Sequence, residues 1–269
     1  MSSLFSNVIE INGNVCFLSD AHFGTPNQQD SERREDMLVS LLNQVGDKTQ
    51  HLFLLGDMFD FWFEYRDVVP KGYFRLFNTL YNLSKKGVKI YYFTGNHDMW
   101  IQDYFEHQFD CQVFRKEQAF LMNGKRCIIG HGDGLGGKQR KYLLIKGIFG
   151  FKPNRVLYSM LHPRQAFSIA RYCSKTSRNS HPADALEFKG EQEHQVQYAR
   201  QVLENEAVDF FIFGHRHIPK QYVLTDDSLL YNCGDWLYNF SYLVFNQEDI
   251  RPQLLFFKSS EQCVDDTNF

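Results

Sequence analysis

The chain has 269 residues, of which 43% are hydrophobic and 16% aromatic, and its formal net charge is −3. This length is sufficient for one large globular domain, and the charge excludes the polybasic composition of many nucleic-acid-binding proteins. No stretch approaches the about 18 apolar residues of a membrane-spanning helix, and the N-terminus has no secretory signal pattern. The six cysteines form no Cys-x-x-Cys pair, which favours a cytoplasmic protein without disulfides.

The first third of the sequence alternates predicted strands and helices. Apolar, β-rich runs predict strands at 15–18, 52–55 and 88–93. Apolar residues at helical spacing predict helices over 31–45 and 73–86. This βαβαβ order indicates a sheet with helices packed on it.

Short strands dominate the later part of the chain. Residues 119–129 predict a hairpin that turns at Asn123-Gly124. Further strands are predicted at 208–213, 221–224, 228–233, 240–245 and 253–257. We expect a mixed α/β sandwich of two sheets flanked by helices over residues 1–258, followed by a disordered tail at 259–269.

The segment 134–183 differs in composition from the rest of the chain. Residues 134–182 contain ten Lys or Arg and no Asp or Glu, interleaved with apolar and aromatic residues. Such a run suits an anionic amphiphile, a membrane surface or nucleic acid, and a purely structural helical face is the alternative. Because the segment is inserted between two of the polar blocks described next, we interpret it as a lid.

Five polar blocks each follow directly on an apolar run. They are Asp20-Ala21-His22, Gly56-Asp57, Gly95-Asn96-His97-Asp98, Gly130-His131 and Gly214-His215-Arg216-His217. Polar residues at the ends of buried strands are where open sheets place active sites. The two-residue period of a strand would point Asp20 and His22 to one side, and His215 and His217 share this spacing.

These residue types suit a site for two cations. Carboxylate, amide and imidazole ligands without thiolate favour Mn, Fe, Zn or Ni over a soft metal, and Asp57 has two oxygens with which to bridge two ions. Two ions about 4 Å apart can hold a phosphoryl group and activate water. A lone histidine at a strand end is usually structural, but seven ligand-type residues in these positions predict a two-metal site.

The order D-x-H, G-D, G-N-H-D, G-H and G-H-x-H resembles the calcineurin-like metallophosphoesterase superfamily. The resemblance implies a four-layered αββα sandwich that binds two divalent metal ions, for which Mn²⁺ is the expected identity. It assigns one metal to Asp20, His22, Asp57 and His217, and the other to Asp57, Asn96, His131 and His215. It further implies that His97 contacts the scissile phosphate or protonates the leaving group, and that Asp98 orients His97.

A narrower resemblance lies in residues 56–62, G-D-M-F-D-F-W, which look like the G-D-x-F-(D/E)-x-W block of UDP-2,3-diacylglucosamine pyrophosphohydrolases. Gly234-Asp235-Trp236 is similar to a second block of that family. The resemblance implies cleavage of this lipid-linked nucleotide sugar to the lipid monophosphate and UMP. It also implies peripheral association with the cytoplasmic face of the inner membrane, and an insert that covers the acyl chains. The candidate substrate-binding residues are Asn96, His97, Trp62, Lys175 and Arg178.

Three alternatives remain open from the sequence. This chain has His97 where the best-known members of that family have Arg, which indicates a divergent branch and leaves another phosphodiester or nucleotide as the substrate. Trp62 is equally interpreted as a core residue. A non-catalytic scaffold could lose ligands without penalty, whereas this chain retains all seven. Nucleic acid is disfavoured because the basic charge is confined to one insert.

Overall fold

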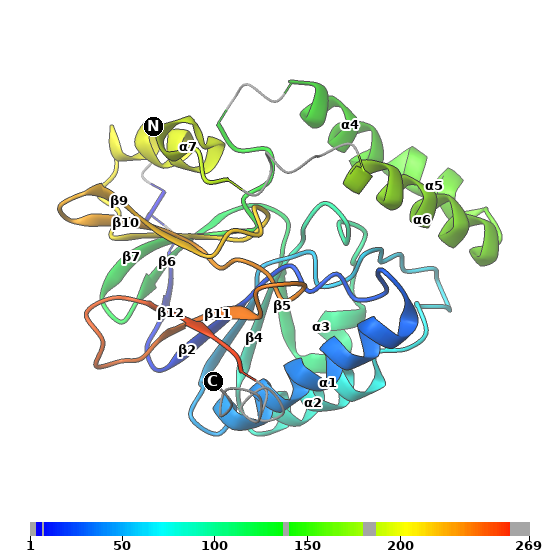
Figure 1. The fold of residues 1–269 in the computed structure, drawn as a ribbon, viewed down its shortest axis with the longest axis horizontal. Helices are drawn as coiled ribbons and strands as arrows, with labels where there is room; N and C mark the ends of the chain where they lie inside the picture. The colour runs from blue at the N-terminus through cyan, green and yellow to red at the C-terminus, as the bar shows by residue number, and fades with distance from the viewer. Residues whose placement is uncertain (1–3, 7, 137–139, 180–186, 259–269) are drawn as a thin grey trace, which may run out of the picture.

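The computed structural model describes residues 4–6, 8–136, 140–179 and 187–258. Two six-stranded sheets face each other, and helices cover the outer face of each (Figure 1). The four-layered αββα sandwich expected from the sequence is confirmed.

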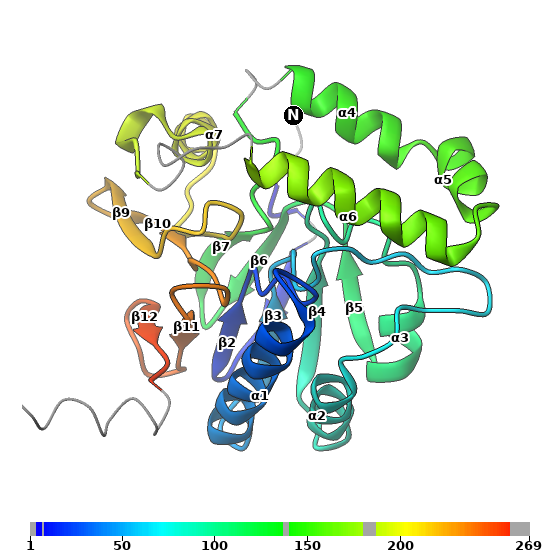
Figure 2. The ribbon, with the colours of Figure 1, turned by 45° about the vertical axis from the view of Figure 1, so that its right-hand side comes forward.

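The first sheet carries most of the N-terminal half. Its strand order is β12-β11-β2-β3-β4-β5. The bounds are β2 (Val15–Leu18), β3 (His51–Leu54), β4 (Lys89–Phe93), β5 (Cys111–Phe114), β11 (Ser241–Phe245) and β12 (Gln253–Phe256). Helices α1 (Gln28–Val45), α2 (Phe74–Lys85) and α3 (Tyr104–Phe109) pack on its outer face (Figure 2).

The second sheet has the order β1-β6-β7-β8-β10-β9. Its bounds are β1 (Ile9–Ile11), β6 (Gln118–Met122), β7 (Lys125–Ile129), β8 (Phe210–Phe213), β9 (Lys220–Thr225) and β10 (Ser228–Asn232). Helix α7 (His194–Leu203), preceded by the short helix η2 (Gly190–Gln192), covers its outer face. The predicted hairpin at 119–129 is confirmed as β6 and β7, paired antiparallel.

The central strands are buried on both faces, and their side chains alternate between two cores. In β2, Cys16 and Leu18 belong to the core under α1 and α2, while Val15 and Phe17 belong to the core between the sheets. This alternation follows from the two-residue period of a strand. A strand that is covered by a packed layer on each face therefore has a continuous apolar sequence.

Helix α1 begins three residues earlier than the predicted helix at 31–45. The side chain of Asn27 accepts a hydrogen bond of 2.9 Å from the backbone N–H of Asp30, which caps the first turn. The apolar pattern marks only the face that Leu38, Leu41 and Leu42 bury, so it misses this polar first turn. Helices α3 and α7 and strand β1 are further elements that the pattern does not predict.

The insert forms three helices that stand beside the sandwich. They are α4 (Arg140–Gly150), α5 (Lys152–Ser159) and α6 (Pro163–Asn179), and both views show them together over one end of the sheets (Figures 1 and 2). Residues 137–139 and 180–183 of the predicted insert, and the predicted tail at 259–269, lie outside the described residues. Among the helices that are described, none is long and apolar enough to cross a membrane.

Candidate metal centre

The five polar blocks lie at the carboxyl ends of five parallel strands that belong to both sheets. β2, β3 and β4 are parallel neighbours in one sheet, and β7 and β8 are parallel neighbours in the other. Parallel neighbours end at the same edge of a sheet, so the loops that follow them converge. Three loops from one sheet and two from the other therefore meet at one place.

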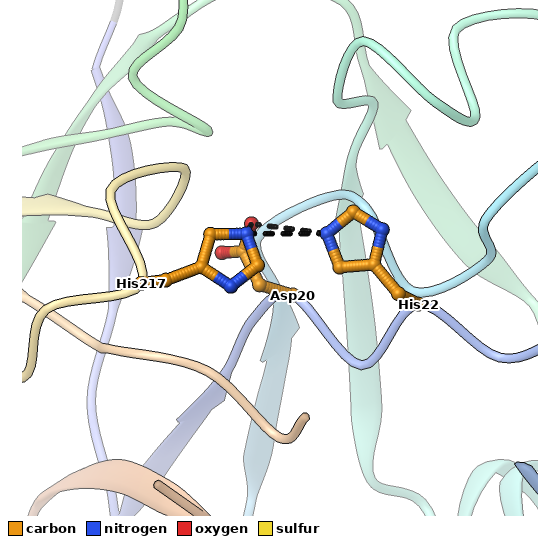
Figure 3. A group of neighbouring side chains, drawn as sticks. All are labelled: Asp20, His22 and His217. Atoms are coloured by element: carbon orange, nitrogen blue, oxygen red, sulfur yellow. Dashed lines mark hydrogen bonds and ion pairs between the residues drawn. The ribbon is translucent and has the colours of Figure 1, made fainter. Parts of the chain in front are cut away.

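The side chains of these loops form two groups, and within each group the ligand atoms lie within 4.8 Å of one another. The groups are Asp20 with His22 and His217, and Asp57 with His131 and His215. Figure 3 shows the first group, in which Nε2 of His217 lies 3.3 Å from Oδ1 of Asp20 and 3.2 Å from Nε2 of His22. Six of the seven predicted ligands are thus brought together in two sets of three.

Asp57 connects the two groups. Its Oδ2 atom lies 3.8 Å from Nε2 of His22 and 3.4 Å from Nε2 of His131. Its Oδ1 atom accepts a hydrogen bond of 2.8 Å from the backbone N–H of His97. One oxygen is held by a neighbouring loop, which leaves the other facing both groups, as a bridging ligand requires.

Several buried polar atoms at this place have no hydrogen-bond partner. Oδ2 of Asp20 accepts bonds from the Ser19 hydroxyl and from the backbone N–H of His215, but its Oδ1 has none, and the same holds for Oδ1 of Asn96 and Nε2 of His131. Unpaired buried polar atoms are costly and rare. Divalent cations would satisfy these atoms, so the residues present fit a metal site, and Asn96, the seventh predicted ligand, offers its oxygen there.

The charges of the groups favour bound cations as well. Burial opposes a charge on His22 and on His131, but the adjacent carboxylates raise the pKa of each to about 10. Burial also opposes ionisation of Asp57, yet His131 and His97 hold its pKa well below the usual range. The carboxylates thus attract positive charge to the centre, which divalent ions supply more fully than protons.

The geometric reason that the sequence suggests for the convergence of these side chains is wrong. Asp20, His22, His215 and His217 lie beyond the strand ends, with φ of 53°, 43°, 70° and 56°. This left-handed backbone costs about 1–2 kcal/mol for each such residue. The tight loops, and not the pleat of a strand, aim the side chains, and strain of this kind is typical of functional sites.

Glycines in the blocks allow the loops to approach one another. A Cβ atom at Gly95 would overlap the carboxylate of Asp57, and one at Gly214 would overlap the hydroxyl of Ser19. Any larger residue would push the loop away from its neighbour. The glycines of the G-N-H-D and G-H-x-H blocks are therefore required by close packing.

In three ligand histidines the Nδ1 atom, which is the ring nitrogen not assigned to metal binding, faces an oxygen atom. Nδ1 of His131 lies 2.7 Å from the carbonyl oxygen of Leu55. Nδ1 of His217 lies 3.5 Å from Oδ2 of Asp235, and Nδ1 of His22 lies 3.8 Å from Oδ1 of Asp60. The bond to Leu55 fixes the tautomer of His131 that leaves Nε2 free to bind a metal, whereas the two carboxylates lie at longer range from the other rings.

Asp60 and Asp235 are residues at the site that sequence patterns did not single out. Asp60 and Asp235 occur in the two tryptophan-bearing blocks at 56–62 and 234–236. A carboxylate close to a tryptophan in each block is the sequence feature that could have indicated them.

His97 and Asp98 are placed differently from each other. Nδ1 of His97 lies 2.9 Å from the carbonyl oxygen of Asp60, and its ring is 4.8 Å from the ring of His22. Asp98 instead accepts hydrogen bonds from the Tyr92 hydroxyl at 2.6 Å and from the backbone N–H groups of Gly95 and Met58 at 2.7 and 2.9 Å. The expected orientation of His97 by Asp98 is therefore corrected: Asp98 fixes the loop backbone, and Asp60 holds the ring.

Trp62 is fully buried. It packs on Phe59 with ring centroids 4.6 Å apart, and its Nε1 donates a hydrogen bond of 2.9 Å to Glu64. Its alternative interpretation as a core residue is confirmed. The residues of this block that face the insert are Asp60 and Phe61.

The remaining substrate-binding candidates, Lys175 and Arg178, fall within helix α6. Their side chains lie outside the described residues. A contact between either residue and a substrate therefore stays a prediction.

Two comparisons with known proteins agree with this site. A family model described as calcineurin-like phosphoesterase matches residues 13–219. A protein of Porphyromonas gingivalis named UDP-2,3-diacylglucosamine hydrolase is 33% identical over 245 residues, which cover 86% of this chain and 94% of that protein. A Vibrio cholerae protein of the same name is 24% identical and covers 86% of this chain and 94% of its own length.

Solved structures show a weaker likeness. One described as a novel archaeal phosphodiesterase has a TM-score of 0.46 and 11% identity, and it covers 91% of this chain and 99% of its own. A likeness of this size does not bear on function.

Proposed function

This chain belongs to the calcineurin-like phosphoesterase family, and we propose that it is a metal-dependent hydrolase of UDP-2,3-diacylglucosamine. Water adds across the pyrophosphate bond, one P–O bond breaks, and the products are 2,3-diacylglucosamine 1-phosphate and UMP. The observation that carries the substrate is the similarity to the P. gingivalis hydrolase over 94% of that protein's length.

The surface of the insert supports a lipid substrate. In the described part of the chain, ten of the eighteen exposed large hydrophobic side chains lie between residues 143 and 172. Met160 is 78% exposed, Tyr172 73% and Leu144 66%. Soluble proteins rarely gather so many exposed apolar side chains unless the surface binds something apolar. Such a surface suits two acyl chains, and the insert that carries it contacts Asp60 at the metal centre through Ser174.

Exposed cations accompany these apolar side chains. Lys152, Arg164 and Arg171 are exposed on α5 and α6. Cationic side chains attract phosphate, while their aliphatic stems cover apolar surface. A diphosphate that bears acyl chains needs both properties in one place, so we assign to the insert the role of a lid that binds this amphiphile.

The seven ligand residues would hold two divalent metal ions, for which we propose Mn²⁺. Asp57 would serve both, since its Oδ2 faces both groups. Such ions would supply charge neutralisation at the phosphoryl group and activation of water. Oxygen and imidazole donors without thiolate suit Mn²⁺.

His97 contacts the phosphate through its Nε2 atom. The carbonyl oxygen of Asp60 can only accept, so Nδ1 of His97, which lies 2.9 Å away, carries the proton. Burial lowers the pKa of His97, which keeps the free ring neutral. The negative charge of a bound phosphate favours protonation of Nε2, and the ring then donates a hydrogen bond or a proton to the departing oxygen.

The same apolar surface supports peripheral association with a membrane, which we propose to be the cytoplasmic face of the inner membrane. A substrate with two acyl chains resides in a bilayer, and an enzyme that acts on it must approach that surface. Basic helices with exposed apolar side chains bind anionic membrane surfaces in this way.

The direct test is turnover of three substrates with Mn²⁺: UDP-2,3-diacylglucosamine, UDP-N-acetylglucosamine and bis-p-nitrophenyl phosphate. The second substrate shares the pyrophosphate but lacks the acyl chains, so it separates nucleotide recognition from lipid recognition. We expect release of UMP from the lipid and little from the short analogue. Efficient turnover of the generic diester with none of the lipid would contradict the proposal.

One observation favours a second candidate, a phosphoesterase for another diester or nucleotide. His97 stands where the best-known UDP-2,3-diacylglucosamine pyrophosphohydrolases have Arg. An Arg binds phosphate through several donors, whereas a His offers one. If this candidate holds, the nucleotide or generic diester is hydrolysed faster than the lipid in the same assay.

A further inference from the structure

Helix α6 of the insert reaches the metal centre through a buried contact at Asp60. The hydroxyl of Ser174 donates a hydrogen bond of 2.8 Å to Oδ1 of Asp60, across 114 residues of sequence. Ser174 is only 7% exposed, whereas its neighbour Tyr172 is 73% exposed. The helix thus turns this hydroxyl inward, toward the carboxylate.

The same oxygen of Asp60 faces two histidines of the site. Oδ1 lies 3.8 Å from Nδ1 of His22 and 3.8 Å from Nδ1 of His97. The ligand-type atoms of these three residues lie within 4.8 Å of one another. One carboxylate oxygen therefore adjoins a metal ligand, the phosphate-contacting histidine and the insert.

The backbone of Asp60 is fixed independently of the insert. Its N–H donates a hydrogen bond of 3.0 Å to the carbonyl oxygen of Phe23, and its own carbonyl oxygen accepts from His97. The bond from Ser174 acts on the side chain instead, because that hydroxyl comes from a separate helix and approaches the oxygen that lies beside both histidines.

We propose that the carboxylate of Asp60 is a positioning group through which helix α6 orients the ring of His22, while the backbone carbonyl of Asp60 holds the ring of His97. His22 binds a metal through Nε2 only while Nδ1 carries the proton, and a carboxylate beside Nδ1 favours that tautomer. The insert then does more than bind lipid: its position is coupled to the metal centre. This inference rests on the phosphoesterase site of the proposed function, and not on the identity of the lipid.

The first test is Mn²⁺ binding to the purified full-length protein, measured by titration calorimetry. We expect Asp60→Asn to weaken binding about tenfold or more, the effect of losing a carboxylate behind a ligand histidine. Ser174→Ala should weaken it on the order of threefold, as for loss of one neutral hydrogen bond. Ser174→Thr keeps the hydroxyl and should bind like the parent.

Matched controls separate this effect from general damage. Ser168 lies on the same helix and is exposed, and the side chain of Asp67 is 86% exposed. Ser168→Ala and Asp67→Asn should bind Mn²⁺ like the parent, and thermal unfolding should report a folded protein for every variant. Equal Mn²⁺ affinity for Asp60→Asn, Ser174→Ala and the parent would overturn the inference.

The second test uses the reciprocity of coupled sites. Mn²⁺ should slow amide hydrogen exchange in residues 163–174 of the parent, and Ser174→Ala should reduce that protection. Exchange that is unaffected by Mn²⁺ in both proteins would show that the insert is not coupled to the centre. Neither readout needs the lipid, so failure of the proposed substrate would leave these results intact.

Discussion

The metal centre and the helical insert are built on opposite principles. At the centre, buried loops from five strands hold the ligand carboxylates through backbone bonds, such as those from His97 to Asp57 and from His215 to Asp20. In the insert, α5 has no buried residue at all, and α6 reaches the sandwich through a few side chains such as Ser174 and Phe167.

The contrast teaches where chemistry and selectivity reside. A two-metal site tolerates little displacement, so the rigid edge of two sheets carries it. A flexible, apolar substrate binds better to a surface that keeps exposed apolar side chains. Changes at the centre should therefore affect every substrate, whereas changes at the exposed apolar side chains of the insert should affect the lipid alone.

The largest effect is expected for Asp57→Ala. Its Oδ2 faces both ligand groups, so its loss would weaken both of the proposed metal positions. We expect kcat/KM to fall by more than about 100-fold, the upper end of what loss of a supporting residue costs, for both the lipid and bis-p-nitrophenyl phosphate. Asp67→Ala, at an exposed carboxylate, is the control, and a scaffold would retain its function in either variant.

Removal of metal should destabilise the sandwich. Mn²⁺ at 100 times its Kd stabilises the folded state by about 2.7 kcal/mol, and about 2–4 °C of Tm accompanies each kcal/mol in a chain of this size. We expect chelation to lower Tm by about 5–10 °C in a thermal scan, because the buried atoms of Asp20, Asn96 and His131 lose their partners. A Tm that is indifferent to Mn²⁺ would argue against a built metal site, and Asp57→Ala should show that indifference.

An intermediate and selective effect is expected in the insert. Leu157 and Met160 are 63% and 78% exposed, and complete burial of one such side chain contributes about 1.5–3 kcal/mol. The double change of both residues to Ser should lower kcat/KM for the lipid about 10- to 100-fold and leave the generic diester unchanged. Val223→Ser on β9, also at an exposed apolar position, should change neither substrate. Equal losses of kcat/KM for both substrates would contradict the proposal that the exposed apolar side chains of the insert act on lipid selectivity alone.

The smallest effect on turnover is expected for Trp62→Phe. The change removes the bond to Glu64 and some core volume, at a cost in unfolding free energy of about 1–2 kcal/mol, with KM unchanged. Trp100→Phe is the matched variant, because Nε1 of Trp100 donates to the carbonyl oxygen of Phe149 in the insert at 3.0 Å. We expect Trp100→Phe to reduce lipid turnover more than Trp62→Phe does. A KM that rises in Trp62→Phe alone would indicate that Trp62 contacts the substrate.

Much of the fold and the ligand set could be predicted from local sequence. Strand β2 coincides with the run at 15–18, and the hairpin turn lies at Asn123-Gly124, since apolar alternation and turn residues act over a few positions. Helix α1 was predicted without its first turn, because a cap such as Asn27 lies outside the apolar pattern.

The partners of the site residues could not be predicted in the same way. Asp98 is one residue from His97 in sequence, yet its bonds go to Tyr92, Gly95 and Met58, while Asp60 holds the His97 ring. The direction of a side chain in a tight loop depends on a left-handed backbone and on neighbouring loops, neither of which leaves a periodic signal.

The sequence by itself determined most of the strands and helices of a two-sheet sandwich, the polar blocks at the strand ends and the basic, apolar insert, because each is a property of a short stretch of chain; the four-layered αββα arrangement followed from the family resemblance. Only the tertiary structure decided that Trp62 is core, that Asp57 shares one oxygen between two groups and that Ser174 meets Asp60. These contacts are between residues of separate elements, which come together only when the two sheets and the helical insert pack.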